Sequence, residues 1–142
     1  MRGKRDRAIL AILVGCGLRR SEVVELKLEY IQRRDERWVI LDLYGKGGRI
    51  RTVPVPEWVK TAVDCWTAAA KVTDGRLFRC VNRTGAVWSH GITEKVIWCV
   101  VKEFAFKANL GNLAPHDLRR CARLCHVVFG QLNEPALHVK LA

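Results

Sequence analysis

The sequence contains no long apolar run, no internal repeat and no low-complexity or linker segment. No stretch approaches the roughly 20 apolar residues of a membrane-spanning helix, so we expect no membrane association. A chain of 142 residues is long enough for one domain that buries about 70% of its unfolded surface, and too short for two. We therefore expect a single domain over residues 1–142.

Acidic residues are scarce as well, because 14 Asp and Glu stand against 25 Lys and Arg and leave a formal net charge of +11. The apolar content of 49% is that of a folded protein and excludes a basic disordered tail. This charge predicts a polyanion as the partner. Charge alone does not distinguish DNA from RNA or from an acidic membrane, and ribosomal proteins are comparably basic.

No C-x-x-C pair occurs among the six cysteines, and no second ligand cluster accompanies the group of His and Cys near the C-terminus. A zinc site built from that group is therefore the weaker interpretation, and we expect neither a metal nor another cofactor. The group comprises His116, Cys121, Cys125 and His126.

The even number of cysteines would suggest disulfides in a small secreted chain. Four of them instead lie inside apolar helical patterns, where a free thiol behaves as a small buried hydrophobe. We expect buried free thiols in a reducing cytoplasm. The four are Cys16, Cys65, Cys99 and Cys121.

The N-terminus has a basic region followed by a short apolar run, which resembles a signal peptide. Asp6 interrupts the basic region, and the residues after the apolar run continue directly into a second helix start. We therefore expect a helix in this segment and no cleaved leader.

Apolar periodicity predicts a mainly helical α+β domain. The helix over residues 93–108 is apolar on much of its circumference, so we expect it to be the central, well-covered helix. Residues 76–88 are polar and turn-rich and predict a loop with at most short strands. The other predicted helices cover residues 5–14, 21 to about 30, 58–72 and about 116–128.

A β-hairpin is predicted near the middle of the sequence. Alternating and β-branched residues over 38–44 and 49–55 flank the turn Gly-Lys-Gly-Gly, which needs the positive φ angles of glycine. Pro54 and Pro56 are expected to stop the second strand. This hairpin places a small antiparallel sheet on one side of the helical bundle.

Two arginine motifs lie almost a hundred residues apart, Gly-Leu-Arg-Arg-Ser-Glu ending at Glu22 and Pro-His-Asp-Leu-Arg-Arg beginning at residue 115. Arg19 follows a glycine-terminated helix, and Glu22 is placed to pair with its guanidinium. His116 and Arg119 face the same way at a helix N-terminus, where free N–H groups and a positive dipole favour a phosphate. With the ammonium of Lys46, these groups suit a phosphodiester and the proton transfers around it.

In this order and spacing, the three motifs resemble the catalytic domain of the tyrosine recombinase or phage integrase family, over about residues 4–130. The resemblance implies that Arg19 and Arg119 grip the non-bridging oxygens of the scissile phosphate. It implies that Lys46 donates a proton to the leaving 5′ oxygen and that His116 acts as base or phosphate ligand. In the family a tyrosine near the C-terminus attacks the phosphorus and forms a 3′-phosphotyrosyl link without metal or nucleotide cofactor.

The chain departs from the family pattern after Arg119, because its two tyrosines, Tyr30 and Tyr44, both precede that residue. We expect both tyrosines to be packing residues. His138 is the candidate for the Leu-Gly-His position of the family, although the segment before it is short and contains Pro135, which interrupts helices. We expect a C-terminally truncated or degenerate catalytic domain that lacks the family's amino-terminal DNA-clamping domain.

The leading hypothesis is a DNA-binding catalytic domain of a site-specific tyrosine recombinase, located with the nucleoid in the cytoplasm. We expect it to bind double-stranded DNA, to self-associate there, and not to cleave DNA alone. The alternative is a non-catalytic DNA-binding integrase relic, and a weaker one is a type IB topoisomerase-like enzyme. The expected DNA contacts around the motifs are Arg20, Arg49, Arg51, Arg120 and Arg123.

Overall fold

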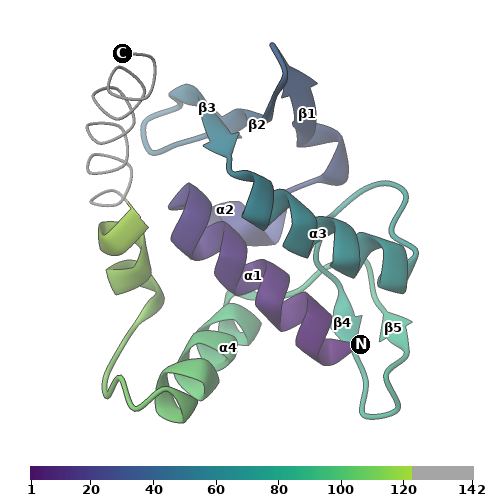
Figure 1. Cartoon of the computed structure of the whole chain (residues 1–142), viewed down its shortest axis with the longest axis vertical. Coiled ribbons are helices and arrows are strands. Elements are labelled where there is room, and N and C mark those ends of the chain that lie inside the picture. The colour runs from purple at the N-terminus through teal and green to yellow at the C-terminus, as the bar shows by residue number, and fades with distance from the viewer. Residues whose placement is uncertain (123–142) are drawn as a thin grey trace, which may run out of the picture.

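The structure is a computed structural model, and it describes residues 1–122. It confirms a mainly helical α+β fold with small antiparallel sheets (Figure 1). A further helix covers residues 115–122, and Leu28–Tyr30 form one turn of 3-10 helix. The other elements are α1 (Arg2–Cys16), α2 (Arg20–Glu25), β1 (Ile31–Arg34), β2 (Arg37–Tyr44), β3 (Ile50–Val55), α3 (Glu57–Ala70), β4 (Cys80–Val81), β5 (Val87–Trp88) and α4 (Glu94–Lys107).

Helix α1 is the central helix of the fold. Figure 1 shows α3 alongside it, α4 on its other side, and the sheet β1–β2–β3 beyond α3. Ile9 and Ile12 are completely buried and Leu13 is nearly so. The prediction that residues 93–108 form the central helix was wrong, because α4 leaves Trp98 39% exposed and Phe106 82% exposed.

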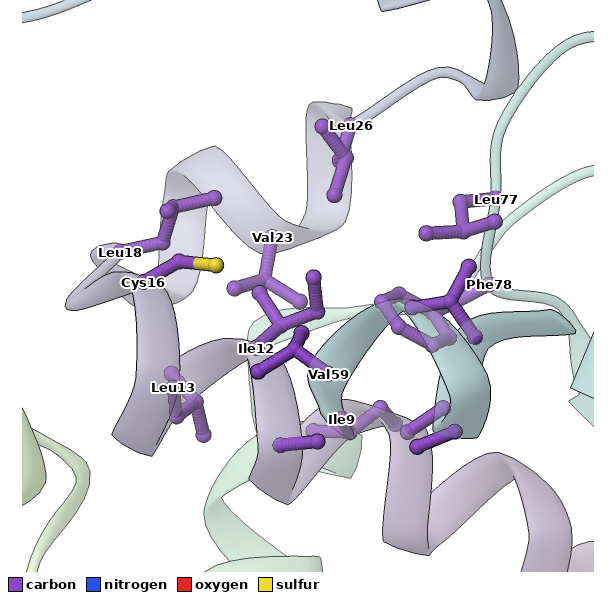
Figure 2. Packing of buried hydrophobic residues seen from close by; sticks show 14 of the residues in the cluster. Ile9, Ile12, Leu13, Cys16, Leu18, Val23, Leu26, Val59, Leu77 and Phe78 are labelled. Atoms are coloured by element: carbon purple, nitrogen blue, oxygen red, sulfur yellow. The ribbon is translucent and has the colours of Figure 1, made fainter. Parts of the chain in front are cut away.

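The hydrophobic core joins α1 to the first turn of α3 and to the segment that follows α3. Figure 2 shows Ile9 and Ile12 packed with Val59 and Phe78. Trp66 is also fully buried, and its indole N–H donates to the carbonyl oxygen of Leu77 across 2.8 Å. A buried indole therefore keeps a hydrogen-bond partner while its ring fills the core.

Only part of the cysteine prediction is confirmed. Cys16 is buried at the end of α1, where loss of water around the thiolate raises the pKa of its thiol to about 12. Cys65, Cys99 and Cys121 are exposed, although each lies in an apolar helical pattern. They lie at the border between the buried and the solvent-facing sides of their helices, and the spacing of apolar residues does not show on which side of that border a residue falls.

The main sheet has the order β1–β2–β3, with antiparallel pairing throughout. Strand β1 was not predicted, and it joins β2 through a turn in which Asp35 and Glu36 have positive φ angles of 48° and 64°. Strand β3 continues through Pro54, contrary to the prediction that Pro54 would stop it. Proline is tolerated there because β3 lies at the edge of the sheet and lacks a second partner for its backbone donors.

A β-bulge in β2 sets which residues of the hairpin face inward. The register shifts between Ile40 and Leu43, and Asp42 adopts a positive φ of 56°. As a result both Ile40 and Leu43 are buried, whereas strict alternation would place Asp42 inward. Tyr44 is 70% exposed at the hairpin, so its predicted role as a packing residue was wrong.

The second helix is shorter than predicted. It ends at Glu25, and Tyr30 follows in the 3-10 turn, where it is half-buried against the core as expected. The early end arises because Leu26 has extended backbone angles, and its N–H and C=O pair with Val23 and Leu77. The apolar stripe at residues 23–28 thus crosses from a helix into an irregular segment.

Gly15 permits the closest approach between α1 and α3. A Cβ atom added at Gly15 would lie 2.3 Å from Cγ2 of Val59 and 2.9 Å from Cζ2 of Trp58. Cβ atoms in proteins do not come this close to other heavy atoms, and the β-branched Val59 has little rotamer freedom to move away. A side chain at Gly15 would therefore force the two helices apart.

The substitution Gly15→Ala is expected to destabilise the protein. Overpacking costs about 1–3 kcal/mol and exceeds the gain of about 1 kcal/mol from the helix propensity of alanine. Gly3→Ala is the matched control, because a Cβ at Gly3 in the same helix has no atom within 4 Å. In thermal unfolding, the melting temperature should fall by several degrees for Gly15→Ala and should not fall for Gly3→Ala. Equal melting temperatures for the two variants would contradict this account of helix packing.

Candidate functional site

Arg19 lies where the sequence places it, between the end of α1 and the start of α2. Gly17 ends α1 in the left-handed conformation, with a φ of 66°, and its N–H donates to the carbonyl oxygen of Leu13. Arg19 is then the N-cap of α2, with extended backbone angles. Its backbone is fixed on both sides, while its side chain remains 37% exposed.

The carboxylate of Glu22 organises this junction. It accepts a hydrogen bond from the backbone N–H of Arg19 at 2.6 Å and another from Nη1 of Arg19 at 3.3 Å. The first bond satisfies a free donor at the helix start, as the third residue of a capping box does. Glu22 is only 7% exposed, so its charge depends on these donors. Ser21 occupies the first turn of α2 and is exposed.

Arg51 of β3 is a second cationic partner of Glu22. Its Nη2 lies 3.1 Å from Oε1 and 2.9 Å from Oε2 of that carboxylate. This pairing across 29 residues was not predicted, although the alternation of inward and outward residues along β3 indicates that Arg51 faces inward. Arg51 shares the inward face of the strand with Val53 and Val55, both buried.

The second arginine motif begins the helix over residues 115–122. Asp117 Oδ2 accepts the backbone N–H of Ala114 at 2.9 Å, which repeats the arrangement at Glu22. Leu118 and Ala122 are buried against the rest of the fold, and Arg119 is 9% exposed. His116 is exposed in the first turn of this helix.

The three motifs are neighbours in the fold. A Cβ atom at Gly17 would lie 3.2 Å from Cβ of Ala122, so the helix that carries Arg119 packs directly on the first motif. A Cβ atom at Gly45 would lie 4.0 Å from Nη1 of Arg19, so the base of the hairpin borders the Arg19 guanidinium. Segments almost a hundred residues apart thus meet at the first motif.

Lys46 extends from the turn between β2 and β3. Gly47 and Gly48 have positive φ angles of 82° and 71°, as predicted, and the N–H of Gly45 donates to the carbonyl oxygen of Arg49 at 2.7 Å. Lys46 is exposed, and within residues 1–122 its ammonium makes no hydrogen bond or ion pair. The ammonium therefore keeps its donors available for a ligand.

An exposed cationic stack adjoins the first motif and was not predicted. The guanidinium carbon of Arg20 lies 5.5 Å from the ring centre of Trp98, and Nζ of Lys102 lies 4.9 Å from the same ring. Nε of Arg20 also lies 3.9 Å from a carboxylate oxygen of Glu94. Apolar spacing had assigned this region of α4 to the core.

The remaining predicted site residues are on the surface or outside the described part of the chain. Arg49 and Arg120 are exposed. Arg123 and His138 lie outside residues 1–122, as do two members of the zinc alternative, Cys125 and His126. Among the described residues, no group of three or more His, Cys, Asp or Glu side chains could hold a metal ion.

Hollows are present on the described part of the molecule both near the motifs and away from them. A hollow of about 640 Å³ lies among residues 74–76 and 89–93, away from the motifs. A smaller one of about 390 Å³ borders on Glu22 and Tyr44. Neither hollow is lined by Arg19, Lys46, His116 or Arg119. In the described part of the chain, no helix is long and apolar enough to cross a membrane.

Comparison with known proteins gives a consistent result. A sequence model described as the Phage integrase family matches residues 1–125. The chain is 33% identical over 115 residues to tyrosine recombinase XerA of Pyrococcus furiosus, which covers 81% of this chain and 38% of the relative. It is 33% identical over 123 residues to tyrosine recombinase XerD of Neisseria meningitidis serogroup B, covering 82% and 39%. The chain thus spans well under half the length of these relatives.

Two solved structures have a similar fold. The XerH site-specific recombinase, in a pre-cleavage complex with its difH substrate, matches with a TM-score of 0.66 and 22% identity over 90% of this chain and 36% of that chain. The XerA recombinase matches with a TM-score of 0.65 and 18% identity over 89% and 43%. At these identities the likeness establishes the fold.

Glu22→Gln should destabilise the protein, because the amide cannot compensate two guanidinium groups. The expected loss is about 1–3 kcal/mol, the typical cost of removing one partner from a buried hydrogen-bonded group. Glu25→Gln in the same helix is the matched control, since its carboxylate pairs with Arg76 on the surface and is 64% exposed. Urea unfolding of both variants should show the larger loss for Glu22→Gln, and equal losses would contradict the central role of this carboxylate.

Proposed function

The chain belongs to the phage integrase family, the tyrosine recombinases, and we propose that it forms the phosphate-binding part of a site-specific recombinase domain that acts on double-stranded DNA. The observation that carries this proposal is that the Lys46 hairpin borders Arg19 while the helix of Arg119 packs on Gly17 of the first motif. Lys46, Arg49 and His116 are exposed and line neither of the two hollows, which suits the backbone of a long polymer better than a small molecule.

The proposed roles follow from the chemistry of each group. Arg19 and Arg119 bind the non-bridging oxygens of the scissile phosphate, where negative charge grows in the transition state. Lys46, at the tip of its hairpin, protonates the departing 5′ oxygen. His116 binds the phosphate or takes a proton, and its place in the first turn of a helix adds free backbone donors.

The attacking group is the component that this chain does not supply. In the proposed reaction a tyrosine oxygen bonds to phosphorus as the bond from phosphorus to the 5′ oxygen breaks, and the released oxygen takes a proton. The chain contains only Tyr30 and Tyr44. Tyr30 is half-buried, and Tyr44 lies on the exposed hairpin. We therefore propose that the chain by itself binds DNA without cleaving it.

Further contacts to the phosphate backbone are proposed for cations near the motifs, namely the partly buried Arg20 and the exposed Arg49 and Arg120. Arg20 is stacked on Trp98, so its guanidinium loses less freedom when it binds a phosphate. We also propose that the protein self-associates on DNA and acts on DNA in the cytoplasm.

Binding of duplex DNA should depend steeply on salt. The observed binding constant, measured by fluorescence anisotropy, should fall with a slope of about 0.9 log units per log unit of salt for each phosphate contacted. Lys46→Gln should reduce this slope by about 0.9, which corresponds to one phosphate contact, and should weaken binding to all DNA sequences alike.

Arg83→Gln is the matched control for that measurement. Arg83 is exposed in the turn between β4 and β5. The same turn contains Gly85, where an added Cβ would lie 3.8 Å from Met1 at the opposite end of α1 from Gly17. The 15 residues of α1 separate this turn from the site by about 22 Å. A flat salt profile, or equal losses for Lys46→Gln and Arg83→Gln, would overturn the proposed DNA site.

Incubation with a nicked suicide DNA substrate should give no covalent adduct with this chain. Denaturing electrophoresis separates a covalent protein–DNA adduct from non-covalent complexes. A tyrosine-bearing C-terminal segment of a relative, added in trans, tests whether the proposed phosphate site can support cleavage once a nucleophile is supplied. An adduct formed by the chain alone would refute the proposed inactivity. Loss of that adduct in Tyr44→Phe would then identify Tyr44 as the attacking group.

A further inference from the structure

Arg51 differs from the other cations near the site in how its guanidinium is held. Its Nη2 is bound to both oxygens of Glu22, at 3.1 and 2.9 Å. Its Nε is buried and has no hydrogen-bond partner within the described residues. Arg49 lies two residues earlier, is exposed, and makes no ion pair within residues 1–122. Arg51 in β3 is thus held by an ion pair, whereas Arg49 in the turn before β3 is not.

The same carboxylate that holds Arg51 also holds the first motif. Glu22 accepts both the backbone N–H and Nη1 of Arg19, so strand β3 and the start of α2 share one buried anion. Arg51 faces inward opposite Leu43, at the end of β3 next to the hairpin turn. The pair therefore ties the base of the hairpin to the residue that the proposed function places on the phosphate.

The hairpin connection is short, so the ion pair between Arg51 and Glu22 at its base restricts the position of Lys46 at its tip. Five residues, 45–49, connect the paired ends, and the N–H of Gly45 donates to the carbonyl oxygen of Arg49 at 2.7 Å. Gly45 in turn borders Nη1 of Arg19, as the 4.0 Å spacing of an added Cβ indicates. A shift of β3 relative to α2 would move Lys46 with it.

We propose that Arg51 is a positioning residue that acts through Glu22 to hold the Lys46 hairpin in register with Arg19. This inference rests on the proposed function for its consequence on DNA, and it replaces a direct phosphate contact as the role of Arg51. The planar guanidinium suits the task because its donors are in fixed directions, whereas the ammonium of lysine has no such geometry.

A double-mutant cycle on DNA binding tests the coupling. Arg51→Gln and Lys46→Gln are measured singly and together, and Arg49→Gln with Lys46→Gln is the matched cycle in the same hairpin. If Arg51 positions Lys46, loss of Lys46 should matter less in the Arg51→Gln background, by about threefold or more, as for residues that share a network. The cycle with Arg49 should be additive.

The salt slope separates positioning from contact. A residue that only positions its neighbour should leave the slope of Arg51→Gln combined with Lys46→Gln equal to that of Lys46→Gln alone. A residue that binds its own phosphate should lower the slope by a further contact of about 0.9. An additive cycle together with that further fall would overturn the proposal and restore Arg51 as a direct DNA contact.

A measurement on the free protein tests the inference independently of DNA. Amide hydrogen exchange at Gly45 should become about tenfold faster in Arg51→Gln, because the hairpin base loses its tie to α2. Exchange at Trp66 in α3 reports whether the fold as a whole is intact, and Arg49→Gln should change neither amide. Unchanged exchange at Gly45 in Arg51→Gln would sink the inference even if wild-type protein binds DNA, whereas failure of wild-type binding alone would sink only the proposed function.

Discussion

One buried carboxylate, that of Glu22, is the constraint on which the arrangement of the site depends. It is nearly inaccessible to water and is compensated by the backbone donor and guanidinium of Arg19 and by the guanidinium of Arg51. A lone charge at this depth would be costly, so the carboxylate and its donors stabilise one another only when α2 and β3 are correctly placed. The geometry of the site thus becomes part of the stability of the fold.

Absent side chains are as important as the charges. Gly15 lets α3 approach α1, and Gly17 lets the last described helix approach the first motif. At both positions a methyl group would come closer to the neighbouring segment than ordinary contact distance. The helix that carries Arg119 can therefore pack directly against the segment that leads to Arg19.

The sequence was informative where local rules operate and uninformative where tertiary contacts decide. The hairpin turn, the helix after Pro115 and the junction at Arg19 were all predicted, because glycine, proline and apolar periodicity have direct backbone consequences. The pairing of Arg51 with Glu22 was missed, since it joins residues 29 positions apart. Helix α4 was assigned to the core because apolar content does not reveal which residues, such as Trp98, remain exposed.

Chemical-shift mapping by NMR with a short DNA duplex is the most direct test that the three motifs form one phosphate site. If the three motifs form one site, amides of residues 19–22, 45–49 and 115–120 should shift together and titrate with a single binding curve, while those around Gly85 at the far end of α1 should not. Shifts confined to one motif, or separate curves for the three, would contradict it.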